Sequence, residues 1–422
     1  MPDLQHPTPA SRLGEREFIA LMALIMALQA LCIDAMLPAL GEIAAEMGET
    51  DPNHRQLVVG VYLICSGFGA LIPGSLADRF GRRPVLFAAL SGYVLLSLAC
   101  AMANSFTHLL IARAAQALVS AGLTVLPGAI VRDRFSGDRM ARTMSFISMV
   151  FLVVPMVAPS FGQAILLFAG WRMIFVGMAL MAGLVAIWAW LRLPETLNPE
   201  YRQKIEVLTI ARNMAHAASD RAAMGYVFGG ALMSAAILGY INTSQQLIAE
   251  HFGAGKLFPL MFMAMAAAMS FANLFNARIV ERFGARRVSH TALLAFIAVS
   301  LGHCWLAFRG GETLAQFMPL MMASTCLIAF TGANFGSIAL QPFARIAGAA
   351  SSLQAFLRML IGASLGTLVG QAYDNSARPL AISLLTCGLV SLALVLYSEK
   401  GRLFRRLNPP GQSRPVGDPG VH

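Results

Sequence analysis

The chain carries little charge for its length. Asp, Glu, Lys and Arg together make up 12% of its 422 residues, whereas an average soluble domain has about 25%. Hydrophobic residues reach 57%, above the ~45–50% of such a domain. This shortage of charge excludes an ordinary soluble domain and predicts a membrane protein.

The apolar runs lack the alternation of polar and apolar residues that marks a membrane β-barrel. They are continuous and about 20 residues long, the length that crosses a ~30 Å hydrocarbon core as a helix. Their backbone groups must therefore be satisfied within helices. We expect an all-α membrane protein with twelve transmembrane helices. The predicted spans are 18–40, 56–77, 84–103, 106–131, 143–168, 171–193, 222–249, 257–280, 288–308, 313–342, 347–373 and 377–398.

Sequence patterns for hydrolysis, nucleotide binding and metal binding are missing as well. The chain has no P-loop, HExxH or Ser/His/Asp arrangement, which argues against an ATP-driven pump or a hydrolase. The six cysteines all lie within predicted spans, without CxxC or Cys/His spacing. Such cysteines behave as small buried hydrophobic residues. We therefore expect no enzyme activity, no cofactor, no metal site and no disulfide.

Basic residues are scarce on one side of the predicted membrane. Of the 31 Lys and Arg residues, 24 fall in segments assigned to the inside, five in outside segments, and Arg113 and Arg358 within spans. Because basic residues near helix ends stay preferentially in the cytoplasm, both termini are predicted to be cytoplasmic. The net charge of +10 then needs no nucleic-acid partner. The first apolar run is too long for a cleaved signal peptide, so it is expected to remain as a helix.

Two similar charged stretches, "GSLADRFGRRP" and "ARIVERFGARR", begin at residues 74 and 277 and share an offset of 203 residues. An offset near half of the chain length indicates an internal duplication, and we expect two pseudo-symmetric six-helix bundles. The predicted parts are an N-terminal bundle (1–193), a cytoplasmic linker (194–221), a C-terminal bundle (222–406) and a disordered tail (407–422).

The first of these stretches reads as a tight cytoplasmic turn between two helices. Gly81 permits a sharp reversal, and Gly74 permits the close approach of a neighbouring helix. Asp78 is the residue that the turn itself does not require. An acid there can engage a helix N-terminus or an arginine from another element, and the contact can break as bundles move. The basic residues that hold the loop inside are Arg79, Arg82 and Arg83.

These stretches together resemble the major facilitator superfamily, and more narrowly its twelve-helix drug/proton antiporter branch of the bicyclomycin-resistance type. "GSLADRFGRRP" matches the superfamily's loop between helices 2 and 3, and "LLIARAAQALVSAGLTVLPGAIVRDRF" resembles its helix 4, with Arg113 and Gln116. "IDAMLPAL" on helix 1, "GWRMIF" and "LPETL" are also similar to the branch. The "VPMVAPSFG" stretch resembles the antiporter motif of helix 5, here Pro155, Ala158, Pro159 and Gly162.

The chain departs from the family's pattern at three places. Ala117 stands where the family usually has glycine, Ala158-Pro159 replaces Gly-Pro, and Gly162-Gln163 replaces a pair of glycines. These changes bear on helix packing, and the fold that the resemblance implies is unaffected. The resemblance implies a monomeric, proton-coupled exporter of drug-like molecules in the bacterial inner membrane, which works by alternating access.

Ionisable groups inside a bilayer are unfavourable and usually face a cavity or a partner. Asp34 is the one acid well inside a predicted span, and Arg113 and Gln116 are three residues apart and share a helical face. We expect Asp34 and Arg113 to couple transport to protons. Arg358 follows Ala347 by eleven residues, about 16 Å into the membrane. The expected substrate cavity is formed by Asp34, Gln116, Asn242, Gln245 and Arg358.

Several alternatives stay open from the sequence. The chain could instead carry an anionic metabolite, with Arg358 as the substrate clamp, or be a membrane receptor that transports nothing. Asp34 could reach the outer surface as an ordinary snorkelling acid. His303 reads better as a packing residue than as a proton relay, and Glu281 in the second stretch is expected to tolerate change better than Asp78. The substrate itself cannot be named from these residues.

Overall fold

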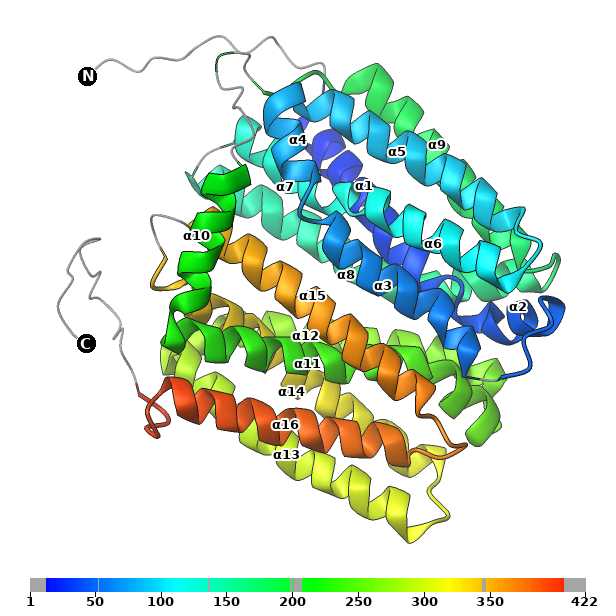
Figure 1. The fold of residues 1–422 in the computed structure, drawn as a ribbon, viewed down its shortest axis with the longest axis vertical. Coiled ribbons are helices and arrows are strands. Elements are labelled where there is room, and N and C mark those ends of the chain that lie inside the picture. The colour runs from blue at the N-terminus through cyan, green and yellow to red at the C-terminus, as the bar shows by residue number, and fades with distance from the viewer. Residues whose placement is uncertain are drawn as a thin grey trace. The chain divides into compact units, whose positions relative to one another are not determined.

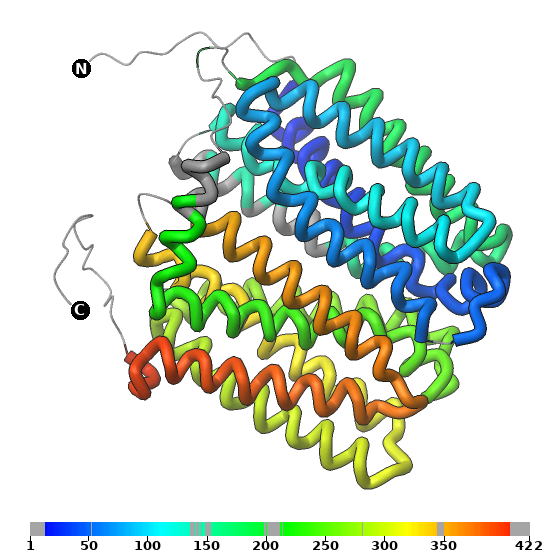
Figure 2. The backbone as a smooth tube through the Cα atoms, viewed as in Figure 1, coloured from blue at the N-terminus to red at the C-terminus, as the bar shows by residue number. Residues whose placement is uncertain are grey.

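The structure is a computed structural model that describes residues 13–51, 53–135, 137–197, 200, 207–343 and 347–405 (Figure 2). Some side chains within these ranges, chiefly in 137–152 and 207–213 and including that of Glu281, lie outside the description. The predicted disordered tail and part of the predicted linker also lie outside the described residues. The expectations for them stay predictions.

The secondary structure of the described residues is helical, with no strand (Figure 1). Short 3-10 turns and one π-helical turn, η4 (Gln246–His251), join the α-helices. The α-helices are α1 (Glu15–Asp34), α2 (Leu40–Glu46), α3 (Leu57–Gly69), α4 (Pro73–Phe80), α5 (Arg82–Ala101), α6 (Phe106–Ser120), α7 (Gly122–Arg134), α8 (Gly137–Leu166), α9 (Arg172–Arg192), α10 (Val207–Ser219), α11 (Arg221–Gln245), α12 (Phe258–Phe283), α13 (Ala285–Arg309), α14 (Leu314–Leu340), α15 (Ala347–Gln371) and α16 (Arg378–Ser398).

The all-helical membrane architecture predicted from the sequence is confirmed. Within the described residues, ten helical stretches are long and apolar enough to cross a membrane, or eleven when the bent pair His54–Gly69 and Pro73–Phe80 forms one span. Another predicted span falls on α8, whose stretch Val153–Leu166 is apolar. The count of twelve and the cytoplasmic termini therefore stay predictions.

Two predicted spans are interrupted near prolines. The span predicted over 56–77 divides into α3 and α4, which are bent by 42° relative to each other. Pro73 begins α4; a proline has no N–H to donate to the carbonyl four residues earlier, and its ring clashes with that carbonyl, so α3 cannot continue through it. Likewise, α1 ends at Asp34, and the chain passes Pro38 as a 3-10 turn, η1 (Leu37–Ala39). Hydropathy alone does not detect either interruption.

The chain divides into two compact units, one formed by Met1–Ala39 with Phe68–Ile205 and one by Leu40–Gly67 with Glu206–His422. Contacts therefore group Leu40–Gly67 with the C-terminal part of the chain, whereas the predicted bundles divide at residue 193. The units are grouped by contacts, whereas the predicted bundles follow the order of the chain, so the predicted bundle boundaries stay a prediction. Each unit is described by itself below.

Helix packing within the two units follows one scheme. In the first unit, α1 packs against α7, α8 and α9, and α5 packs against α6 and α9. In the second unit, α11 packs against α14, α15 and α16, and α13 packs against α14 and α16. Each helix pair of the first unit corresponds to a pair of the second unit whose helices come in the same order along the chain; for example, α1 with α8 corresponds to α11 with α15. This correspondence supports the internal duplication inferred from the sequence.

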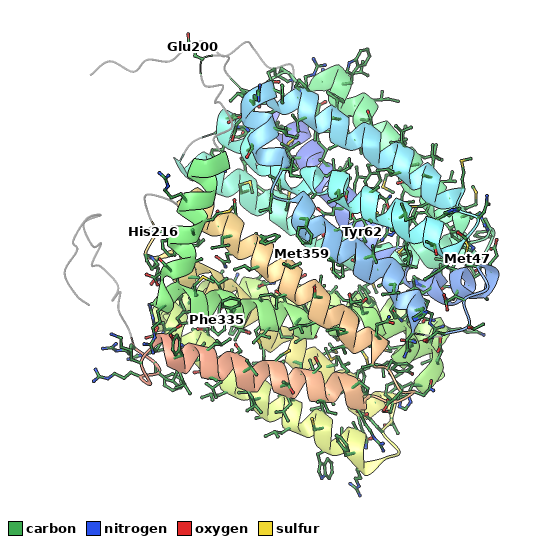
Figure 3. The ribbon with its side chains drawn as sticks, in the orientation of Figure 1. Met47, Tyr62, Glu200, His216, Phe335 and Met359 are labelled. Carbon is green, nitrogen blue, oxygen red and sulfur yellow. The ribbon has the colours of Figure 1, made fainter. Side chains whose placement is uncertain are left out.

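The core of the second unit forms around α11, which is largely buried. Tyr226 of α11 packs edge-on against Phe335, which is labelled in Figure 3, with ring centroids 5.2 Å apart. Gly366 of α15 lies so close to α11 that an added Cβ would come within 2.8 Å of Leu238 Cβ. Small residues at a helix crossing allow this close approach between membrane helices.

Candidate functional site

Asp34 is the last residue of α1 and is buried, with 5% of its surface exposed. No hydrogen bond or ion pair joins its carboxylate to another described residue. The helix stops directly after it, because Pro38 lies four residues on and the chain turns there as η1. The acid predicted from the sequence is therefore a buried group at a helix end, without a fixed partner in the part of the chain that the structure describes.

The predicted antiporter motif on α8 packs against this same helix end. Gly162 is buried, and a Cβ added there would overlap the carbonyl oxygen of Ala35, the residue after Asp34. Only glycine leaves room for that carbonyl. Ala158, one helical turn earlier, is 1% exposed, and Pro155 and Pro159 lie within the same helix. The motif thus fixes the distance between α8 and the residues that follow Asp34.

Arg113 is fully buried on α6 and holds the preceding turn of α1. Its Nη1 donates to the sulfur of Cys32 at 3.1 Å, and its Nη2 donates to the backbone oxygen of Cys32, also at 3.1 Å. Its guanidinium carbon lies 5.8 Å from the centroid of the Phe175 ring. The charge of Arg113 is therefore anchored two residues before Asp34 rather than on its carboxylate.

Gln116 completes the buried polar group around Arg113. Its Oε1 accepts from Arg113 Nη1 at 2.8 Å, and its Nε2 donates to the hydroxyl of Ser97 on α5 at 2.7 Å. Arg113, Gln116 and Ser97 are all fully buried. Buried polar groups that satisfy one another in this way hold a defined geometry. The shared helical face predicted for Arg113 and Gln116 is thus present, and Ser97 is an addition that the sequence did not indicate.

The other predicted cavity residues belong to the second unit. Asn242 and Gln245 are buried on α11, and each has a side-chain oxygen without a hydrogen-bond partner among the described residues. The Nδ2 of Asn242 donates to the backbone oxygen of Leu238 at 2.8 Å. Arg358 is exposed on α15, and no hydrogen bond or ion pair to another described residue holds it. A cavity that combines these residues with Asp34 stays a prediction.

His303 is buried on α13 and packs edge-on against Phe317, with ring centroids 5.5 Å apart. Its Nε2 has no hydrogen-bond partner among the described residues. This geometry agrees with a packing role.

The charged loop between α4 and α5 forms a three-residue ion cluster. Arg82 Nη1 donates to Asp78 at 2.5 Å, and Arg82 Nε donates to Asp133 at the end of α7 at 2.8 Å. The Asp133 side chain is 15% exposed and the Asp78 side chain 47%. Arg79 is exposed beside the ring of Phe80. Asp78 therefore engages an arginine of its own loop, whereas the sequence suggested a helix N-terminus or an arginine from another element.

The Glu195 carboxylate caps the N-terminus of α5, next to this loop. Its Oε1 accepts the backbone N–H of Arg82 at 2.9 Å, and its Oε2 accepts that of Arg83 at 3.1 Å. The carboxylate thus satisfies N–H groups that a helix start leaves unpaired and lies at the positive end of the helix dipole. Gly81 turns here with a φ of 106°, and a Cβ on it would come within 2.6 Å of Glu195 Oε2.

Two of these residues were quoted within sequence motifs but given no role. Glu195 belongs to "LPETL" and Asp133 to "RD". An acid three residues after a span's last basic residue, Arg192, is the signal that could have indicated a cap, although its partner helix lies 113 residues earlier. The close approach expected at Gly74 is not present, because a Cβ there would be at an ordinary 3.8 Å from Val125.

The second copy of the loop has a related cluster in the second unit. Arg286 Nε donates to Glu399 at 2.7 Å, and the Tyr226 hydroxyl donates to the same Glu399 oxygen, also at 2.7 Å. His290 Nδ1 accepts the backbone N–H of Phe404 at 3.0 Å. A neutral His290 therefore carries its proton on Nε2, which donates to the Tyr226 oxygen at 2.9 Å.

A group of polar contacts at residues 53–56 was also absent from the sequence predictions. Within the second unit, Arg55 pairs with Glu250 of η4 at 2.6 Å, and Gln56 donates to Gln246 at 2.9 Å. Asn53 Nδ2 donates to the backbone oxygen of Gln371, at the end of α15, at 3.0 Å. These contacts join the start of α3 to segments about 190 or more residues later in the chain.

Among the described residues, no group of three or more His, Cys, Asp or Glu side chains is placed to hold a metal ion. The six cysteines are free thiols.

Comparison with known proteins gives a family match over most of the chain. The sequence model of the Major Facilitator Superfamily matches residues 19–367. A bicyclomycin resistance protein homolog of Haemophilus influenzae is 27% identical over 393 residues, which cover 92% of this chain and 98% of that protein. The multidrug resistance protein MdtL of Klebsiella pneumoniae (strain 342) is 28% identical over 376 residues, which cover 88% and 93%.

Solved structures share the fold at low identity. The crystal structure of a peptide transporter POT in complex with sulfate aligns with a TM-score of 0.71 at 16% identity and covers 91% of this chain and 94% of that one. The crystal structure of a D-xylose-proton symporter aligns with a TM-score of 0.69 at 14% identity and covers 92% and 98%.

Proposed function

Because the chain belongs to the major facilitator superfamily, we propose that it exports small organic molecules in exchange for protons by alternating access. The chain is a multi-pass membrane protein, a secondary transporter related to multidrug resistance proteins of bacteria. Proton coupling, the outward direction and the drug-like substrate are the proposal. The observation that carries it is the buried carboxylate of Asp34.

Asp34 is suited to bind and release one proton during the cycle. Its carboxylate is buried and has no described partner, so neither protonation state is fixed by an ion pair. A buried acid without a counter-charge favours the neutral form, whereas water or a bound cation favours the ionised form. A conformational change that wets the end of α1 would therefore drive proton release. A cationic substrate would compete for the same oxygen atoms.

Arg113 positions this acid. It holds the sulfur and the backbone oxygen of Cys32, so the last turn of α1 keeps one place relative to α6. Its donors go to Cys32 and Gln116, so no bond to the Asp34 carboxylate has to break in each cycle. We infer that Arg113 sets how readily Asp34 ionises, and that Gly162 keeps α8 against the same helix end.

Two polar clusters would serve the conformational change. The Arg82 cluster with Asp78 and Asp133 can open and reform as helices move. The contacts of Arg55 with Glu250 and of Gln56 with Gln246 join segments that the sequence assigns to different halves. We propose that these last contacts close one end of the transport path and separate when that end opens.

Proton release from detergent-solubilised protein on addition of substrate tests the proposal. Wild type should release protons into a weakly buffered solution when a transported drug is added, and Asp34→Asn should release none. Asp374→Asn makes the same change at an exposed loop position and should behave as wild type. An unchanged signal in Asp34→Asn would place the coupling proton elsewhere, with His303 as the next residue to test.

A second candidate is a transporter of an anionic metabolite. It is favoured by one observation, namely that Arg358 is exposed on α15 without a described hydrogen-bond or ion-pair partner. An arginine in that state can bind a carboxylate or phosphate through two parallel hydrogen bonds. Counterflow in proteoliposomes with cationic and anionic substrates decides between the candidates. Loss of anion exchange in Arg358→Ala, with cation exchange absent from wild type, would favour the anion.

A further inference from the structure

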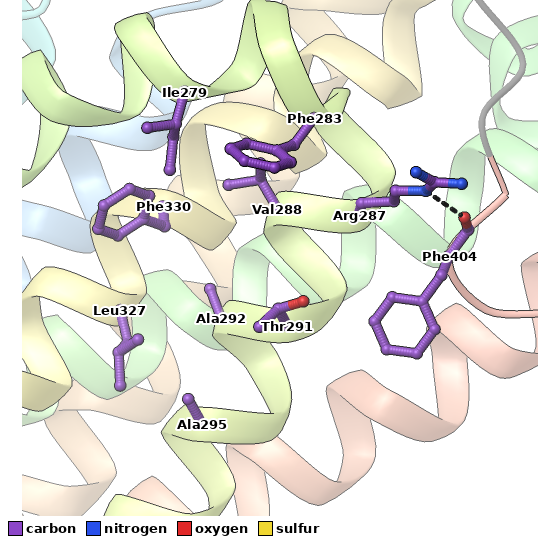
Figure 4. A pocket seen from close by; sticks show the side chains of 10 residues that line it. All are labelled: Ile279, Phe283, Arg287, Val288, Thr291, Ala292, Ala295, Leu327, Phe330 and Phe404. Carbon is purple, nitrogen blue, oxygen red and sulfur yellow. Dashed lines mark hydrogen bonds between the residues drawn. The ribbon is translucent and has the colours of Figure 1, made fainter.

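An apolar groove of about 670 Å³ lies on the second unit, between the end of α12, the start of α13 and the middle of α14 (Figure 4). This size falls within the range of small-molecule sites. Most of the lining side chains are hydrocarbon, and the groove is open along one side. The residues that form its walls include Ile279, Phe283, Val288, Ala292, Leu327 and Phe330.

Arg287 and Phe404 lie at one end of this groove, as Figure 4 shows. Arg287 is exposed, and its Nε donates to the backbone oxygen of Phe404 at 3.1 Å. Its two terminal nitrogens make no hydrogen bond to another described residue. The Phe404 backbone is held from the other side by His290, which accepts its N–H at 3.0 Å. The guanidinium is therefore held at the mouth of the groove, and the N–H groups of its two terminal nitrogens are available to a ligand.

The surrounding chain is strongly basic. Residues 278–287 and 399–405 contain seven Lys and Arg residues and two Glu residues. One of these acids, Glu399, is 7% exposed and already accepts from Arg286 and Tyr226. The mouth of the groove therefore attracts anions. Three other apolar grooves of the molecule, on α1 with α8, on α5 with α6 and on α15 with α16, have no Lys or Arg in their linings.

We propose that this groove binds an anionic phospholipid, with one acyl chain along the hydrocarbon walls and the phosphate on the terminal nitrogens of Arg287. A ligand for it must be apolar over most of its length and negatively charged at one end, which describes such a lipid. The walls belong to helices that are apolar and long enough to span a membrane, so hydrocarbon chains are the surrounding solvent. Basic pockets between membrane helices bind phosphate head groups in this way.

Arginine is better suited than lysine to this contact because its planar fork pairs with two phosphate oxygens. The Nε atom is already used by Phe404, which orients the fork outward. The lipid would also pack against the Phe404 ring and so restrain the last described turn of the chain. This inference does not depend on the proposed transport function, since it concerns different residues and a different ligand.

Native mass spectrometry of the full-length protein in detergent, with added phosphatidylglycerol or phosphatidylcholine, tests the site. Wild type should retain phosphatidylglycerol in preference to phosphatidylcholine. Arg287→Ala should weaken phosphatidylglycerol retention at least about fivefold, since one basic residue near a lipid surface is worth about 1 kcal/mol. Arg287→Lys should be intermediate. Arg282→Ala is the matched control, because Arg282 is exposed at the end of α12 and does not line the groove.

Four results would overturn the proposal. Wild type could retain both lipids equally, or Arg287→Ala could retain phosphatidylglycerol as wild type does. Arg282→Ala could weaken retention as much as Arg287→Ala, which would indicate diffuse surface charge. Soluble inorganic phosphate could displace the lipid at similar concentration, which would indicate a phosphate site without a chain. As a second measurement, Ala295→Trp fills the groove and should reduce lipid retention while Arg287 is intact.

Discussion

Arg113 donates two hydrogen bonds to Cys32, one to its sulfur and one to its backbone oxygen, each 3.1 Å long. A backbone carbonyl near a helix end is thereby tied to a buried charge on another helix. This relationship separates two roles that a sequence reading would combine. The arginine holds the position of α1, and the acid two residues later keeps a carboxylate that can change its protonation state.

Substitution of Arg113 should therefore affect both stability and coupling. Arg113→Ala leaves the buried Cys32 oxygen and Gln116 without their donor, so we expect a loss of about 1–3 kcal/mol in unfolding free energy. Arg113→Lys keeps the charge but lacks the fork, so proton release should persist at a shifted pH. Thermal melting and proton release measure the two effects. Wild-type behaviour of Arg113→Ala in both would contradict the positioning role.

Gly162→Ala should disturb the end of α1. The added Cβ would overlap the Ala35 carbonyl oxygen, and such overpacking destabilises by about 1–3 kcal/mol. Gly183→Ala, on α9, is the control because no atom lies within 4 Å of the added Cβ; there alanine should be neutral or stabilise by up to about 1 kcal/mol. Equal melting temperatures for the two variants would disprove the close packing.

Asp78→Asn should abolish or strongly slow transport while insertion and expression stay near normal. The Asp78 side chain is 47% exposed, so its ion pair with Arg82 contributes at most about 1 kcal/mol to stability. The loss should therefore appear in the rate of reconstituted transport and hardly in the melting temperature. Arg79→Gln, a charge change in the same loop outside the ion cluster, should be milder.

Wild-type transport rates in reconstituted Asp78→Asn would refute this role of the loop. The matching substitution in the second copy, Glu281→Gln, is expected to be better tolerated. The Glu281 side chain lies outside the described residues, so that expectation rests on the sequence alone.

Glu195→Gln should loosen the start of α5. The carboxylate accepts backbone N–H groups with both oxygen atoms, and an amide replaces one of these acceptors with a donor. We expect a loss of about 1–2 kcal/mol, from an unpaired N–H and a weaker interaction with the helix dipole. Hydrogen exchange should accelerate at the Arg82 and Arg83 amides. Unchanged exchange there would mean that the cap contributes nothing.

Glu312, between α13 and α14, should make stability depend on pH. Burial raises the pKa of its carboxyl from 4.5 to about 7, and neither oxygen has a hydrogen-bond partner among the described residues. The folded protein therefore holds this proton more tightly than the unfolded chain. Stability from this group is present below pH 4.5, falls as the pH rises to about 7, and stays lower above.

The test is the difference between wild type and Glu312→Gln, which removes this titration. The melting temperature of wild type should fall relative to that of Glu312→Gln between pH 4.5 and 7. Parallel curves over this range would exclude the effect.

The helix positions were predictable because the hydropathy of each span is averaged over about 20 residues, so single residues have little influence on the result. The spans predicted over 84–103 and 377–398 differ from α5 and α16 by two residues or fewer at either end. The same averaging conceals short interruptions. The break between α3 and α4 spans only three residues, and its cause, Pro73, is local stereochemistry that a 20-residue window does not resolve.

The candidate site was predictable in its residues and less so in its contacts. An acid and an arginine within membrane spans are rare enough to be noticed one at a time, which identified Asp34 and Arg113. Their partners depend on how helices rotate about their axes, which one sequence does not encode visibly. The Arg113 bonds to Cys32 and the Glu195 cap on α5 are contacts of this kind. The first joins residues that are 81 positions apart in the sequence, and the second joins residues that are 113 positions apart.

The hydrogen bond between Gln56 and Gln246 spans 190 residues and sets an order of events during synthesis. At about 5–20 residues per second, Gln56 leaves the ribosome roughly 10–40 s before its partner exists. Until then the Gln56 carboxamide and the Arg55 guanidinium lack the partners that they have in the folded protein. Water, lipid head groups or an insertion factor has to hydrogen-bond these two side chains during that interval. Assembly of this protein therefore requires temporary partners for a polar segment that is buried in the folded state.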